Sequence, residues 1–98
     1  MDKNKKSFVR HILNDRGGDA DIGKGVRIEL TDGRELTVSG CRGFLEYGEE
    51  RIRLALLSGG LEISGEGLLC DSYLNGAVLI RGKISAIALS EGTDEAVL

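Results

Sequence analysis

Residues 18–25 fit the pattern G-x-x-x-x-G-K of a phosphate-binding loop. In that motif a Ser or Thr follows the lysine and holds magnesium, whereas this chain has Gly25 there. The motif also needs a strand before it and a helix after it, so that backbone N–H groups converge on the phosphate, and the expected order here is the reverse. Asp19 and Asp21 would further repel an anion. We therefore do not expect nucleotide binding.

Cys41, Cys70 and His11 are the candidates for metal binding or nucleophilic catalysis. Zinc sites use Cys and His ligands at close spacing, and this chain has two distant cysteines and one histidine. A lone histidine beside an apolar helical stripe gives no convincing triad. We expect no metal, no cofactor and no catalytic residue. We interpret the cysteines as small thiols beside apolar strands in a reducing compartment, with a disulfide between them as the alternative.

Two pairs of carboxylates are candidates for acid–base chemistry, Glu49 with Glu50 and Glu62 with Glu66. Paired carboxylates act as acid and base when burial separates their pKa values. Both pairs lie in expected turns or on polar strand faces, so we expect solvated charges. The sequence predicts a protein that is not an enzyme.

The chain has 98 residues, of which 41% are hydrophobic and 30% charged, and this is typical of one water-soluble domain. Its net charge of −3 argues against a broad electrostatic surface for nucleic acid or anionic lipid. No stretch approaches the roughly 18 apolar residues of a membrane span, and residues 1–6 are not followed by the apolar region of a signal peptide. We expect no secretion by signal peptide, no membrane insertion and no nucleic-acid partner.

Three segments are expected: an N-terminal helix and glycine-rich linker in residues 1–25, a single β domain in residues 26–89, and a flexible acidic tail in residues 90–98. Residues 17–25 have almost nothing apolar to bury, which is typical of a linker. In residues 6–15 the apolar side chains recur at helical spacing and gather on one side of a helix, namely Phe8, Val9, Ile12 and Leu13.

After residue 25 the apolar period changes to two, and Asp32-Gly33 is the signal of a type I′ hairpin turn. Turn signals recur along the chain, and no helix is available for βαβ crossovers. The prediction is an all-β fold with a short N-terminal α-helix, a small antiparallel meander that forms a curled sheet or partial barrel of about six to eight short strands. Gly82 is expected at a bend that curls the sheet.

One expected hairpin, in residues 42–54, groups charged and aromatic side chains. Opposite charges that face each other across two strands contribute roughly 0.2–1 kcal/mol a pair. The group is either a salt-bridged outer face of the sheet or a recognition surface for another protein or a second copy of the chain. In the second interpretation the partner-binding residues are Phe44, Glu46, Tyr47, Glu50, Arg51 and Arg53.

The same hairpin and two later segments resemble the YabP/YqfC family of sporulation proteins of endospore-forming Firmicutes. The matching segments are G-F-L-E-Y at 43–47, E-R-I-R-L at 50–54, G-L-E-I at 60–63 with Gly65, and V-L-I-R-G-K-I-S-A-I at 78–87. The resemblance covers residues 26–89, and the L-E-Y and E-R-I-R blocks are its specific part.

The resemblance implies a small non-enzymatic protein of the mother-cell cytoplasm, peripheral at the forespore outer membrane, with a role in spore coat assembly or in building the forespore envelope. A membrane-bound sporulation protein is the partner it implies. We therefore expect a protein–protein interaction or assembly module, whose exposed sheet edge or charged hairpin either binds a sporulation protein or assembles with copies of the chain into a homo-oligomer. The alternative is an Sm-like RNA-binding ring subunit, because a short N-terminal helix followed by five bent strands is also the layout of Sm-like barrels.

Overall fold

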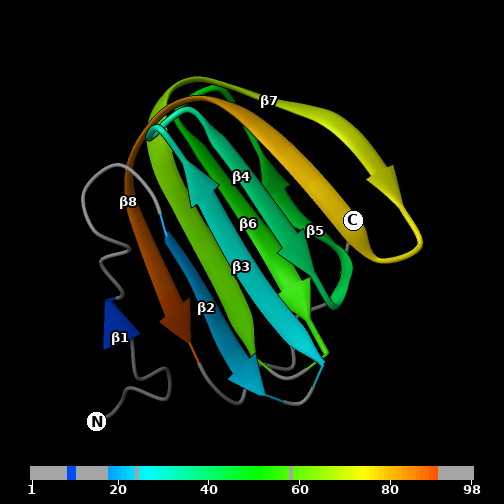
Figure 1. Ribbon diagram of the computed structural model, residues 1–98. Coiled ribbons are helices and arrows are strands. Elements are labelled where there is room, and N and C mark those ends of the chain that lie inside the picture. Colours follow the sequence, from blue (N-terminus) through cyan, green and yellow to red (C-terminus); the bar gives the residue numbers. More distant parts are fainter. Residues whose placement is uncertain (1–8, 11–17, 24, 58, 91–98) are drawn as a thin grey trace, which may run out of the picture.

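The computed structural model describes residues 9–10, 18–23, 25–57 and 59–90, and the regular elements in this part of the chain are all β-strands. The strands are β1 (Val9–Arg10), β2 (Gly18–Gly23), β3 (Val26–Thr31), β4 (Glu35–Ser39), β5 (Cys41–Tyr47), β6 (Arg51–Leu56), β7 (Gly60–Leu74) and β8 (Ala77–Ser90). They pair antiparallel in one open sheet with the order β2-β3-β4-β8-β7-β6-β5, and β1 pairs with β8 (Figure 1). The predicted all-β fold is confirmed.

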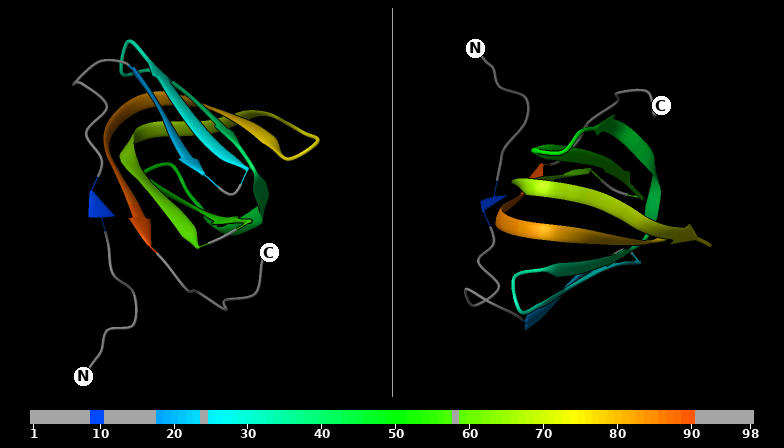
Figure 2. Two further views of the ribbon diagram at one scale, coloured as in Figure 1. Left: turned by 60° about the horizontal axis from the view of Figure 1, so that its bottom comes forward. Right: turned by 90° about the horizontal axis from the view of Figure 1, so that it is seen from above.

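The hairpin of β7 and β8 is long and bent. β7 has 15 residues and β8 has 14, and register shifts interrupt their pairing near the middle. Because both strands bend there, the sheet folds over, and β5 and β6 lie opposite β2, β3 and β4 (Figure 2). The core lies between these layers, and its largest fully buried side chains are Ile28, Leu36, Ile52, Leu54, Leu56, Ile63 and Ile80.

Two glycines allow the long strands to touch at the bend. At Gly82 the φ angle is +139°, and a Cβ there would lie 2.7 Å from the carbonyl oxygen of Gly67. A Cβ on Gly65 would overlap the carbonyl oxygen of Lys83. Only glycine fits such a close backbone approach. The predicted bend at Gly82 is therefore confirmed.

The hairpin of β3 and β4 holds the bend from one side. β4 pairs along the first half of β8, and the β3–β4 turn continues this contact past the bend. The N–H of Gly82 donates to the carbonyl oxygen of Arg34, and the N–H of Ile84 donates to that of Gly33, both at 3.0 Å. Backbone groups that the bend would leave unpaired are thus satisfied.

The hairpin of β5 and β6 holds the bend from the other side in the same way. β6 pairs along the first half of β7. The N–H of Gly65 donates to the carbonyl oxygen of Glu50 at 3.0 Å, and the N–H of Leu68 donates to that of Glu49 at 2.8 Å. The two hairpins therefore occupy equivalent places, one on each long strand.

The period-two pattern produces the strands as predicted. In β3 the apolar residues Val26, Ile28 and Leu30 are buried, and the residues between them are exposed. Asp32 and Gly33 have φ angles of 55° and 66°, and positive φ at both central positions is what a type I′ turn requires. The predicted β3–β4 turn is confirmed.

The N-terminal helix predicted for residues 6–15 is wrong at Val9 and Arg10, which pair as β1 with Leu89 and Ala88; the other residues of that segment lie outside the described residues. A helix of two or three turns is unstable on its own, and the edge of β8 offers backbone groups with which an extended segment can pair. The predicted acidic tail lies outside the described residues, except for Ser90 at the end of β8.

The linker predicted for residues 17–25 is wrong at Gly18–Gly23, which forms β2 and pairs with β3. The prediction considered only side-chain burial, whereas an edge strand is held by backbone hydrogen bonds. β7 and β8 are also single long strands rather than chains of short ones. In the described ranges there are eight strands and no helix, which departs from an Sm-like layout. No helix that could cross a membrane is found among these residues.

Candidate functional site

A bulge in β5 decides which side chains reach the outer face of the β5–β6 hairpin. The register shifts between Phe44 and Glu46, so Leu45 has no partner of its own on β6. Without the shift Glu46 would lie opposite the fully buried Ile52, but with it Glu46 lies opposite Arg53. The bulge thus turns the Glu46 carboxylate outward, which is a common use of such irregularities.

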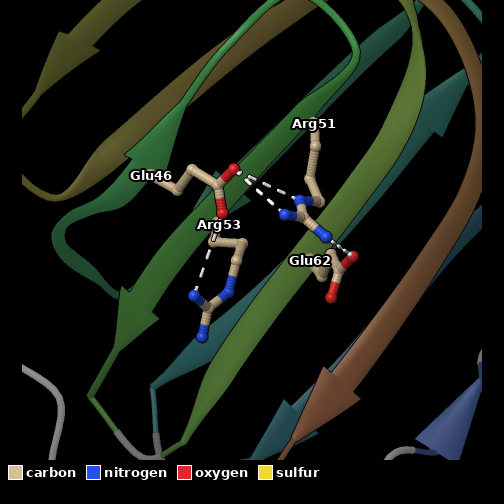
Figure 3. A network of polar contacts seen from close by, with 4 residues as sticks. All are labelled: Glu46, Arg51, Arg53 and Glu62. Carbon is tan, nitrogen blue, oxygen red and sulfur yellow. Dashed lines mark hydrogen bonds and ion pairs between the residues drawn. The ribbon is translucent and has the colours of Figure 1, made fainter.

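Four charged side chains form a network on the outer face of β5, β6 and β7, and Figure 3 shows it from close by. Oε2 of Glu46 accepts hydrogen bonds from Nε and Nη2 of Arg51 at 3.3 and 3.2 Å. Nη1 of Arg51 lies 3.5 Å from Oε2 of Glu62, and Nη1 of Arg53 lies 3.9 Å from Oε1 of Glu46. We call Glu46, Arg51, Arg53 and Glu62 the charged network.

The charged network is partly open to water. The side chains of Arg51 and Glu46 are 52% and 39% exposed, and those of Arg53 and Glu62 are each 26% exposed. The hydrogen bonds with Glu46, followed by the negative charges of Glu46 and Glu62, raise the pKa of Arg51 above its ordinary value. Ion pairs this exposed add little to folding stability, because water and salt screen them. The network therefore fixes the positions of charges without being needed to hold the sheet together.

A shallow, open hollow of about 600 Å³ adjoins the charged network. Its walls include Glu46, Arg51 and Glu62 from the network, with Glu49 and Glu50 from the turn between β5 and β6. The backbone carbonyls of these two turn residues hold the bend, while their side chains are exposed. With four carboxylates to one guanidinium in its walls, the hollow is acidic.

Phe44 and Tyr47 lie on the other side of β5 from the charged network. The Phe44 ring meets that of Tyr47 edge to face at 5.5 Å, and that of Tyr73 on β7 at 5.6 Å. The Tyr47 hydroxyl accepts a hydrogen bond from the backbone N–H of Cys70 at 2.8 Å. These side chains join β5 to the second half of β7, with which it shares no strand pairing in the described sheet.

Cys41 is buried and Cys70 is half-buried, and both are free thiols. Burial raises the pKa of each of them, so neither has the lowered pKa of a reactive cysteine. Within the described part of the chain no group of three or more His, Cys, Asp or Glu side chains could hold a metal ion. His11 lies outside the described residues.

The structure brings together three of the six residues predicted for partner binding, Glu46, Arg51 and Arg53, and sets Glu50 at the adjoining hollow. Phe44 and Tyr47 lie on the other side of β5, where Phe44 contacts Tyr47 and the Tyr47 hydroxyl bonds to Cys70 of β7. Sequence reasoning considered Glu62 only as an acid–base partner of Glu66, and it did not place Glu62 or Tyr73 beside the β5–β6 hairpin; β7 contributes both from a distant part of the chain. Glu62 could have been found from its charge, because it is opposite to that of Arg53 and the two residues pair in register on neighbouring strands.

The sequence profile of the YabP family matches residues 23–96. The chain belongs to the YabP family. The match spans all of β3 to β8 and hence the charged network and the aromatic contacts. No curated protein and no solved structure matches the chain. Membership of the YabP family implies a sporulation protein, and the sporulation proteins of this family are not known as enzymes.

Proposed function

We propose that this YabP family protein is a non-enzymatic interaction module of the mother cell, which binds another sporulation protein while the forespore envelope or spore coat is built. The observation that carries the proposal is the charged network of Glu46, Arg51, Arg53 and Glu62, an ordered set of charges on an exposed face of the sheet. Charges that are oriented in advance steer and orient a partner in an interface.

The specific sequence blocks of the family resemblance both contribute to the charged network. The L-E-Y block supplies Glu46, and the E-R-I-R block supplies Arg51 and Arg53. These charges add little to stability, yet β5 departs from regular pairing at Leu45 to turn Glu46 outward. The backbone irregularity at Leu45 thus places Glu46 in ion pairs that the fold does not need. This placement supports a role of Glu46 in recognition.

The partner we propose is a membrane-bound sporulation protein at the forespore outer membrane, with this chain docked peripherally on its mother-cell side. The acidic hollow beside the network, with Glu49 and Glu50 exposed in its wall, favours a partner surface that carries basic residues. An interface of this kind weakens as salt concentration rises.

The test exchanges two charges of the network in one double variant, Glu46→Arg with Arg51→Glu. The exchange keeps the net charge of the chain and the attraction between the two side chains, and it inverts the field that a partner meets. It also turns the contacts of these positions with Arg53 and Glu62 into like-charge contacts. We expect only a small fall of the urea midpoint, because exposed charge contacts contribute little to stability, and loss of the captured partner when the tagged protein is recovered from sporulating cells, with the captured proteins quantified by mass spectrometry.

The matched control is Glu29→Lys with Lys83→Glu, which exchanges two exposed charges outside the network and also keeps the net charge. The control is expected to capture the same partner as the wild type. If the Glu46 and Arg51 exchange captured that partner as well as the control does, the charged network would not be the docking surface and the proposal would fail.

A further inference from the structure

β5 and the second half of β7 lie side by side in opposite directions without pairing as strands in the described sheet. At one end the N–H of Cys41 donates to the carbonyl oxygen of Gly76 at 2.9 Å, and at the other end the N–H of Leu68 donates to that of Glu49 at 2.8 Å. The chain advances by the same number of residues from Cys41 to Glu49 as from Leu68 to Gly76, so both bonds fit one antiparallel register. We call this junction, residues 41–49 against residues 68–76, the seam.

A side chain replaces the backbone pairing in the middle of the seam. The register set by the two end bonds would bring the carbonyl oxygen of Tyr47 to the N–H of Cys70. The N–H of Cys70 donates instead to the Tyr47 hydroxyl, at 2.8 Å. The two backbones therefore lie a tyrosine side chain apart here, and not at the about 4.8 Å that separates paired strands.

Bulges on both strands keep the middle of the seam unpaired. The register of β5 shifts on both sides of Phe44, and that of β7 shifts between Cys70 and Ser72. A bulge bends its strand and ends regular pairing. The rings of Tyr47 and Tyr73, which both contact Phe44, lie where the backbone pairing is missing.

The seam is held less firmly than the junction of β6 with the first half of β7. That junction has five register pairs, from Arg51 with Ser64 to Ala55 with Gly60. In the middle of the seam the contacts are the hydroxyl bond and the rings, and Tyr47 is 47% exposed. A region with few and exposed contacts opens at a lower free energy than the core. The seam is therefore expected to open while β6 stays paired with β7.

We propose that the seam is a latch, in which the middle of β5 parts reversibly from β7 within the folded chain and the Tyr47 hydroxyl holds the two strands together. When the latch opens, the facing backbone edges of β5 and β7 become free, and free strand edges are what an added strand binds. The latch thus controls access to these edges. Tyr47 lies on the other side of β5 from the charged network, and the proposal does not depend on the function proposed for that network.

The Cys41 thiol can report on the opening from the far end of the seam. Cys41 is 5% exposed, and its thiol donates to the carbonyl oxygen of Gly43 at 3.5 Å and is hydrogen-bonded with the side chain of Tyr73. Separation of β5 from β7 would remove Tyr73 and admit a thiol reagent. Cys70→Ala removes the second thiol but keeps the backbone N–H that bonds to Tyr47.

The first test measures how fast an aromatic disulfide reagent labels Cys41 in the variant Cys70→Ala, with and without Tyr47→Phe. Phenylalanine keeps the ring beside Phe44 and removes the hydroxyl. From the net contribution of one hydrogen bond, we expect the labelling to become about threefold to tenfold faster. Because a local opening exposes little surface, both rates should hardly change at low urea concentrations, unlike the rate of a reaction that needs global unfolding.

The matched control is Ser85→Ala, also combined with Cys70→Ala. Oγ of Ser85 donates to the carbonyl oxygen of Ser64 at 3.1 Å, so the control likewise removes one bond between a hydroxyl and the backbone, but outside the seam. It should lower the free energy of unfolding about as much as Tyr47→Phe does and leave the labelling of Cys41 unchanged. If both variants sped the labelling equally, Cys41 would react only through global unfolding, and the latch would be refuted.

The second test uses the unaltered chain and compares amide hydrogen exchange in the two halves of β7 by NMR. The amide of Cys70 should exchange at least about tenfold faster than those of Leu61 and Ile63, which are buried in the first half, and with less dependence on urea. Equal protection and equal urea dependence of the three amides would overturn the proposal. Neither measurement involves a partner, so the latch and the docking function can fail separately.

Discussion

The β3–β4 and β5–β6 hairpins both hold the bend of the long strands β7 and β8, but their own strand pairing differs. Each lies along the first half of one long strand, and the turn of each accepts two backbone hydrogen bonds at the bend. The ladder between β3 and β4 runs without a register shift, whereas that between β5 and β6 shifts twice. The regular hairpin shows that holding the bend does not require bulges.

The outward side chains of the two hairpins differ as well. The middle of the β4 outer face is Thr37, beside Leu79 of β8, whereas at the corresponding place on β6 Arg53 lies between Glu46 and Glu62. The buried sides of both hairpins are apolar. The two hairpins thus differ in the outward side chains at their centres although both hold the bend, and each serves as the comparison for the other.

The largest expected loss of stability comes from substitutions at the bend of β7 and β8, which both hairpins hold. Gly82→Ala adds a Cβ 2.7 Å from the carbonyl oxygen of Gly67 at a φ angle of +139°. Backbone strain and overpacking together should cost about 4 kcal/mol of the free energy of unfolding. Gly65→Ala meets the backbone of Lys83 and should be similarly damaging.

Gly67→Ala is the control for the bend variants, measured in the same urea titrations. Gly67 has a φ angle of +62°, but a Cβ there would meet nothing within 4 Å. It should therefore show only the left-handed backbone penalty of about 1 kcal/mol. A loss from Gly82→Ala no greater than this would mean that the close approach at the bend is not needed.

The next effect tests whether the buried sides of the hairpins are equivalent. Leu36 of β4 and Leu54 of β6 are both fully buried leucines in the same core. Leu36→Ala and Leu54→Ala should each lower the free energy of unfolding by about 3 kcal/mol, the usual cost of the lost burial and the cavity. The measurement is chemical denaturation of both variants under one set of conditions. Losses that differed by more than about twofold would contradict equal structural roles.

Local sequence patterns predicted the features that depend on residues close together in the sequence. The alternation in β3 and the Asp32-Gly33 turn depend on adjacent side chains and preferred φ angles, and both were predicted correctly. The pairing of Gly18–Gly23 depends on the backbone edge of β3, which side-chain hydrophobicity does not reveal. For the candidate site, proximity along one hairpin predicted that Glu46 and Arg51 would meet.

The parts of the candidate site that could not be predicted depend on contacts between distant segments. Glu62 reaches the charged network through the pairing of β6 with β7. The bulge at Leu45 shifts the alternation by one residue, so Tyr47 lies on the same side of β5 as Phe44, which contacts Tyr73, and not beside the charges. A one-residue shift moves every later side chain of a strand to the other face, and no local pattern in β5 reveals it.

The smallest expected effect is a difference between the two hairpins in how the free energy of unfolding depends on pH. Of the two, only the β5–β6 hairpin begins with an ionisable residue in the core. β5 starts with the buried Cys41, whereas β3 starts with the buried Val26. Burial raises the pKa of Cys41 above its ordinary value of 9.0, against smaller lowering effects of hydrogen bonds with the Gly43 backbone and Tyr73. As pH rises, the unfolded chain therefore loses this proton before the folded chain does. The stability linked to Cys41 is fully present below pH 9.0 and is lost as pH rises from there through the raised pKa.

Cys41→Val makes the two hairpins alike and should flatten the fall of the unfolding free energy between neutral and alkaline pH. The change is read as the slope of stability against pH in urea titrations under a reducing agent, so a constant packing cost of the valine cancels. Cys70→Ala is the control for a less buried thiol, whose pKa burial also raises, and it should flatten the slope less. Equal slopes for the wild type and Cys41→Val would show that the thiol of β5 ionises as freely in the folded chain as in the unfolded one. Water would then reach the Cys41 thiol in the folded chain, in spite of the neighbouring contact between the rings of Phe44 and Tyr73.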